Sequence, residues 1–179
     1  MRKVVLTYGI IAGVIIALLM VISGSLASGF EENSYSMVVG YATMIISLSM
    51  TFFAIKSYRD NQSGGAITFG KGVLIGLYVS LIASVFYVVG WEIYSSIAMP
   101  NWVDHYAQHA VDALKKSGAS DAAILQKTKE MADFKEMYKN PLYNYGMTFL
   151  EIFPVGIVIS LISAAFLRRK VASGQRAVA

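Results

Sequence analysis

The sequence predicts an all-α membrane protein with four transmembrane helices, both termini in the cytoplasm, and a helical hairpin on the outer side. Apolar residues make up 56% of the chain and charged residues 15%, whereas a soluble domain is about a quarter charged. The charges are also absent in blocks, which leaves four apolar runs. Each run has about 20 to 25 residues, enough to cross a hydrocarbon core of roughly 30 Å.

The predicted spans form one membrane domain and cover residues 4–27, 35–56, 71–95 and 143–167. The first span could also be read as a cleavable signal peptide, because Arg2 and Lys3 precede it. Its apolar run is longer than the 7 to 15 residues usual for such a peptide. We therefore expect it to remain in the protein as a span.

Residues 100–140, between the third and fourth spans, predict an amphipathic helical hairpin on the outer side. Its first helix should end at Gly118, and Ser120 can cap the second. Asn140 and Pro141 should then stop the second helix.

Small residues recur every four positions in all four spans. Apolar burial cannot drive helix association inside lipid, so close backbone approach at small residues has to replace it. The pattern predicts a compact bundle. The four ladders are Gly9, Gly13 and Ala17; Thr43, Ser47 and Thr51; Gly72, Gly76, Ser80 and Ser84; and Gly156, Ser160 and Ala164.

The basic residues predict the orientation. Most of the fifteen Lys and Arg lie before the first span, between the second and third, or after the fourth, and Asp60 is the only acid among them. This satisfies the positive-inside rule with both termini in the cytoplasm. The pI of about 9.2 therefore indicates topology and contact with anionic membrane lipids rather than nucleic acid. The chain has no cysteine, which excludes disulfides and thiolate chemistry.

Several motifs resemble one bacterial family over nearly the whole chain. They are Gly40-Tyr41-Ala42-Thr43-Met44, Ala54-Ile55-Lys56-Ser57-Tyr58-Arg59-Asp60, Tyr138-Lys139-Asn140-Pro141 and Thr148-Phe149-Leu150-Glu151-Ile152-Phe153-Pro154-Val155-Gly156. Together they resemble the domain of unknown function 4199 family of Bacteroidetes-type membrane proteins. The resemblance implies a multi-pass protein of the bacterial inner membrane with no established activity, and it supplies no catalytic residues.

Glu92 and Glu151 are the first candidates for chemistry, because a carboxylate within a span is costly and suggests a function. Both should lie toward the outer leaflet, where two neighbouring carboxylates could share a proton. That pairing would suit a proton or cation relay. The alternative is that both are solvated at the interface or hydrogen-bonded to tyrosines.

His105 and His109 are the only histidines. Their four-residue spacing places both rings on one helix face, where they can ligate a single metal ion. The pattern lacks a third ligand, so two ordinary surface histidines are the alternative. We expect no resident metal or cofactor.

Two further groups lie at the ends of the spans. Lys56, Tyr58, Arg59 and Lys71, at the inner loop, either fix the orientation or form a docking site for a lipid head group or partner. The aromatic residues at the outer ends are interpreted as an aromatic belt without a ligand. They are Tyr87, Trp91, Tyr94 and Trp102.

Three functions remain open. The first is a non-enzymatic structural, accessory or interaction protein whose hairpin binds a protein partner, since no nucleophile–base pair or phosphate loop is evident. The second is a small transporter or cation-handling protein using Glu92 and Glu151, which would need a homo-oligomer because four spans leave little room. The third is a membrane enzyme acting on lipid. A solvent-filled cavity at Glu151 would favour the second, and a groove lined by both histidines the third.

Overall fold

Four helical segments of the computed structural model are long and apolar enough to cross a membrane. They are Arg2–Gly24, Val38–Gln62, Phe69–Ala98 and Pro141–Leu167. The structure describes residues 1–26 and 34–169, and in those residues it holds no strand, only helices, turns and one isolated backbone bridge. The all-helical class with four spans is confirmed.

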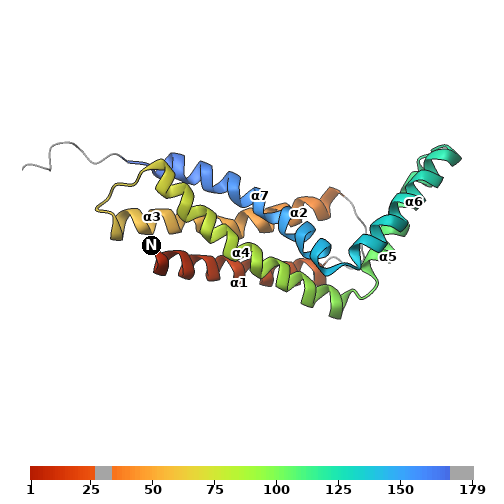
Figure 1. Cartoon of the computed structure of the whole chain (residues 1–179), viewed down its shortest axis with the longest axis horizontal. Helices are drawn as coiled ribbons and strands as arrows, with labels where there is room; N and C mark the ends of the chain where they lie inside the picture. The colour runs from red at the N-terminus through yellow and green to blue at the C-terminus, as the bar shows by residue number, and fades with distance from the viewer. Residues whose placement is uncertain (27–33, 170–179) are drawn as a thin grey trace, which may run out of the picture.

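The helices form one bundle with a protruding hairpin. Helices α1, α2, α3, α4 and α7 run along the bundle, and α5 and α6 project from the end opposite the N-terminus (Figure 1). Their bounds are α1 Arg2–Leu26, α2 Ser34–Leu48, α3 Met50–Gln62, α4 Phe69–Ala98, α5 Trp102–Lys116, α6 Asp121–Tyr138 and α7 Pro141–Leu167.

The second span consists of two helices that meet at Ser49. The Ser49 hydroxyl donates a hydrogen bond to the carbonyl of Ile46 at 2.6 Å. The backbone N–H of Ser49 still donates to the carbonyl of Ile45 at 2.9 Å, so the chain stays helical across this one-residue break. Helix α3 then runs past the predicted end at residue 56 to Gln62. The connection to α4 is short because the chain first turns at Gly64 and Gly65, both with positive φ.

Asn140 and Pro141 begin the last helix as well as ending the hairpin. The Asn140 side chain accepts a hydrogen bond from the N–H of Leu142 at 3.0 Å, which caps α7. Pro141 occupies the first helical position, where no N–H is needed. The fourth span therefore begins before the predicted residue 143. Ser120 caps α6 as expected.

The core of the bundle is the seam between α4 and α7, where two of the predicted ladders interlock. A Cβ atom on Gly76 would lie 2.6 Å from the Ser160 hydroxyl, and one on Gly156 would lie 2.6 Å from the Ser80 Cβ. Helix α1 also approaches α4 at a glycine, since a Cβ atom on Gly9 would lie 2.9 Å from the Ile82 side chain of α4. The predicted packing at small residues is confirmed.

An ion pair between Asp104 of α5 and Lys135 of α6 joins the two helices of the hairpin. The hydrogen bond from Lys135 and its positive charge lower the pKa of the Asp104 carboxyl below its ordinary value. Both side chains are largely exposed, so the pair orients the hairpin more than it stabilises it.

Substituting Gly76→Leu should destabilise the bundle by about 1–3 kcal/mol, because the new side chain would overlap Ser160 in a seam without free space. Thermal unfolding in detergent micelles, followed by circular dichroism, measures the loss. Gly40→Leu is the matched control, since no atom of the described part of the chain lies within 4 Å of a Cβ at Gly40. Equal losses in the two variants would contradict the role of the seam.

The Asp104–Lys135 pair should show a defined pH dependence. Because the folded pKa of Asp104 is lowered, the pair contributes stability above the unfolded pKa of about 3.9, and this is lost as the pH falls through the folded pKa. Carboxyl titration by NMR should give a lower midpoint for Asp104 in the wild type than in Lys135→Gln. Identical midpoints would mean that the pair does not form in solution.

Candidate functional site

A cavity of about 450 Å³ lies where the hairpin meets the bundle. This volume is within the range of small-molecule pockets. Six aromatic residues line it, namely Tyr87, Trp91, Trp102, Tyr106, Phe134 and Tyr138. The polar side chains of the lining include His109, Thr148 and Glu151.

Helical spacing directs these rings to one place. Side chains four positions apart share a helix face, and α4, α5 and α6 each contribute such a pair. The pairs are Tyr87 and Trp91, Trp102 and Tyr106, and Phe134 and Tyr138. The rest of the lining consists of His109 of α5 and of Met147, Thr148 and Glu151 of α7.

Trp102 is at the centre of the ring cluster. Its centroid lies 5.3 Å from that of Trp91 and 4.9 Å from that of Tyr138, with both pairs edge to face. Edge-to-face ring pairs stabilise a fold by more than the burial of their apolar surface alone. Because Trp91 belongs to the bundle and Tyr138 to the hairpin, the cluster joins the two parts and holds the walls of the cavity in place.

Among the described residues, Glu151 supplies the one carboxylate of the lining. The Tyr87 hydroxyl donates a hydrogen bond to its Oε2 at 3.1 Å, which orients the carboxylate. Glu151 lies about 24 Å along α7 from its end at Leu167, at 1.5 Å per residue. The residue is exposed, which leaves carboxylate lone pairs available to a ligand.

The cavity thus combines one carboxylate and the His109 imidazole with six aromatic rings. Burial raises the pKa of the Tyr138 phenol, so this group stays protonated at neutral pH. The faces of aromatic rings carry partial negative charge. The electrostatics of the site favour a ligand that is positively charged and also apolar.

The two predicted glutamates have different partners. The side-chain N–H of Asn144 donates a hydrogen bond to Glu92 Oε2 at 3.2 Å, whereas Glu151 is bound by Tyr87. Glu92 does not line the cavity. The structure brings Glu151 to the cavity without Glu92, and a proton shared between them stays a prediction.

The two histidines are divided in the same way. His109 lines the cavity, whereas His105 lies outside the lining, and both residues are exposed. Among residues 1–26 and 34–169, no group of three His, Cys, Asp or Glu side chains is placed to hold a metal ion.

The predicted inner-loop residues have two different surroundings. Arg59 is buried and forms an ion pair with Asp60 at 2.6 Å. The Lys71 ammonium lies 5.8 Å from the centroid of the Tyr58 ring. Tyr58 and Lys71 line a second cavity, which neither Lys56 nor Arg59 lines.

The interpretation of the outer aromatics as a belt is wrong for Tyr87, which is buried. Belt residues face the lipid interface, whereas Tyr87 lines the cavity and is only 8% exposed. Trp91 and Trp102 also line the cavity, and for them a place in a belt stays a prediction. Sequence reasoning also missed Phe134 and Tyr138 as parts of the site. The available signal was the four-residue spacing of aromatic residues on both hairpin helices.

Comparison with known proteins gives one match. Residues 7–169 match the family described as "Protein of unknown function (DUF4199)", which confirms the resemblance seen in the motifs. No curated protein and no solved structure matches the chain.

Substituting Trp102→Ala should loosen the hairpin from the bundle, since it removes three ring contacts worth about 0.5–1.5 kcal/mol each. Hydrogen exchange should accelerate in α5 and α6 and stay unchanged in α1. Tyr145→Ala, which removes an aromatic residue that is 40% exposed, is the control. Unchanged exchange in α5 and α6 would show that the ring cluster does not hold the hairpin.

Proposed function

We propose that this chain, which belongs to the DUF4199 family of proteins of unknown function, binds a small organic ammonium ion at the outer side of a bacterial inner membrane and catalyses no reaction. One observation carries the proposal. The cavity between bundle and hairpin joins the Glu151 carboxylate to six aromatic side chains.

An alkylammonium ion suits both features of this cavity. Its charge is attracted to Glu151 and to the faces of the Trp and Tyr rings, at about 0.5–2 kcal/mol for each cation–π contact. Its methyl groups can be buried against the same rings. A hard cation such as Ca²⁺ needs six to eight oxygen ligands, and the lining offers one carboxylate and a few hydroxyls. The chemistry of the walls therefore favours an organic cation.

The packing beyond the cavity supports binding rather than passage. Ile152, next to Glu151 in the chain, is fully buried. Further along the seam, Ser80 lies against Gly156. A cation at Glu151 therefore has a closed core beyond it. This supports a binding role over the transporter alternative.

The lining also supports a non-enzymatic role. The Thr148 hydroxyl donates its hydrogen bond to the carbonyl of Asn144 at 3.0 Å. It is therefore bonded to the backbone of its own helix and not to a base such as His109, which a nucleophilic hydroxyl would need.

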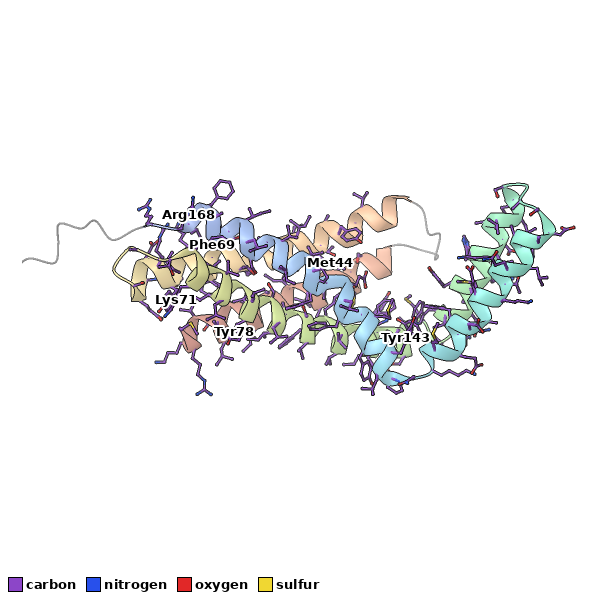
Figure 2. The ribbon with its side chains drawn as sticks, turned by 45° about the horizontal axis from the view of Figure 1, so that its top comes forward. Met44, Phe69, Lys71, Tyr78, Tyr143 and Arg168 are labelled. Atoms are coloured by element: carbon purple, nitrogen blue, oxygen red, sulfur yellow. The ribbon has the colours of Figure 1, made fainter. Side chains whose placement is uncertain are left out.

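The distribution of charge supports the orientation. The N-terminus, which Arg2 and Lys3 adjoin in the sequence, lies at the end of the bundle opposite the hairpin (Figure 1), and Figure 2 shows Lys71 at that same end. The positive-inside rule assigns that end to the cytoplasm. The hairpin and the cavity beneath it would then face the outer side.

Choline is a suitable probe, and the protein carries its own reporter. Both tryptophans of the chain line the cavity, so tryptophan fluorescence of the purified protein in micelles follows this site. Glu151→Gln should weaken choline binding roughly 10- to 100-fold, because it removes the charged partner of the ammonium group. Titration of both proteins with choline measures the change.

Two controls separate charge from shape. The alcohol 3,3-dimethyl-1-butanol, in which carbon replaces the nitrogen of choline, should bind weakly and respond little to Glu151→Gln. Glu92→Gln removes a nearby carboxylate outside the lining and should leave choline binding intact. Equal binding of the neutral analogue would contradict the proposal. Equal effects of the two substitutions would instead favour a relay that uses both glutamates.

A further inference from the structure

The second cavity lies at the opposite end of the bundle, beside the N-terminus of α4, and has a volume of about 770 Å³. Three cationic side chains line it, those of Lys71, Arg168 and Arg169. Figure 2 shows Phe69, Lys71 and Arg168 together at this end, far from Tyr143 near the hairpin. This site is therefore separate from the outer cavity.

A backbone bridge assembles the site from two distant segments. The N–H of Ile67 donates to the carbonyl of Arg169 at 3.1 Å, and the N–H of Arg169 donates to the carbonyl of Ile67 at 3.0 Å. The bridge ties the end of α7 to the loop before α4. It thereby places Arg168 and Arg169 around the same cavity as Lys71.

The three cations form no ion pair within the described residues. Asp60 is the only acid in the neighbouring segments, and it interacts electrostatically with Arg169. Both of its carboxylate oxygens are nevertheless bound by Arg59, at 2.6 and 3.2 Å. Lys71 has the ring of Tyr58 as its neighbour instead. The cavity consequently keeps a positive charge that a ligand can neutralise.

We infer that this cavity binds the phosphate-bearing head group of an anionic phospholipid. A guanidinium group such as that of Arg168 or Arg169 can donate two parallel hydrogen bonds to two oxygens of one phosphate. A lysine such as Lys71 acts as a point charge. The first N–H groups of α4 add partial positive charge at the same place.

Apolar side chains beside the cavity favour a lipid over soluble phosphate. Phe69, in the lining, is 40% exposed, and Phe166, two residues before Arg168, is 80% exposed. Exposed rings at the end of a membrane span can lie along acyl chains. With the head group in the cavity, the acyl chains of the same lipid would lie against this apolar surface. The lipid would belong to the leaflet that we assign to the cytoplasmic side.

The test compares phosphatidylglycerol with zwitterionic phosphatidylcholine on the full-length protein, by native mass spectrometry from detergent micelles. The wild type should prefer phosphatidylglycerol. The double substitution Lys71→Gln/Arg169→Gln should lower affinity for that lipid about 30-fold, because two cations are removed. The bridge should persist, since Arg169 contributes only backbone atoms to it.

Lys3→Gln/Lys56→Gln is the matched control, because it removes the same charge from the same end without altering the cavity lining. It should keep the preference for phosphatidylglycerol. Equal affinity of the wild type for both lipids, or equal losses in the two double variants, would overturn the inference.

Inorganic phosphate forms the third arm of the experiment. It should displace phosphatidylglycerol only at a large molar excess, because it lacks the acyl chains. If equimolar phosphate displaced phosphatidylglycerol from the wild type, and phosphate binding were lost in Lys71→Gln/Arg169→Gln, the ligand would be a soluble phosphate. That result would overturn the assignment to a lipid.

Discussion

The close approach of α4 and α7 is the constraint on which the rest of the structure depends. Lipid tails are as apolar as leucine, so these helices gain little from burying apolar surface and associate through backbone contact at small residues. Gly76 and Gly156 permit that contact, each against a serine of the other helix. Helices α1 and α3 then pack on this pair. The core of the bundle is accordingly built from glycine and serine as much as from large apolar side chains.

The seam also determines where the two cavities form. On α4 the ladder of small residues ends at Ser84, and Tyr87 and Trp91 follow. Rings of this size cannot share so narrow a seam, so space opens between the helices and the aromatic residues of the hairpin enclose it. At the other end the helices terminate, and the bridge between Ile67 and Arg169 surrounds the second cavity with cations. The two sites share helices, with a packed core between them.

Part of each site could be recognised from the sequence. Glu151 stood out because a carboxylate inside an apolar run is costly, and Tyr58 and Lys71 because they lie at the ends of spans. Glu92 met the same criterion as Glu151, yet it lies outside the cavity and is bonded to Asn144. The aromatic lining could not be recognised, because a ring at a span end follows the same pattern whether it faces lipid or a neighbouring helix.

The sequence by itself determined the fold class and the main packing surfaces. Four apolar runs of membrane-spanning length allow few other folds, and spacing along a helix dictates which small residues share a face. Only the tertiary structure decided which faces meet. It joined Tyr87 to Glu151, left Lys71 without an acidic partner among the described residues, and brought Arg169 to Ile67. The physical reason is that contacts between helices depend on their rotation and relative height, which periodicity within one helix does not specify.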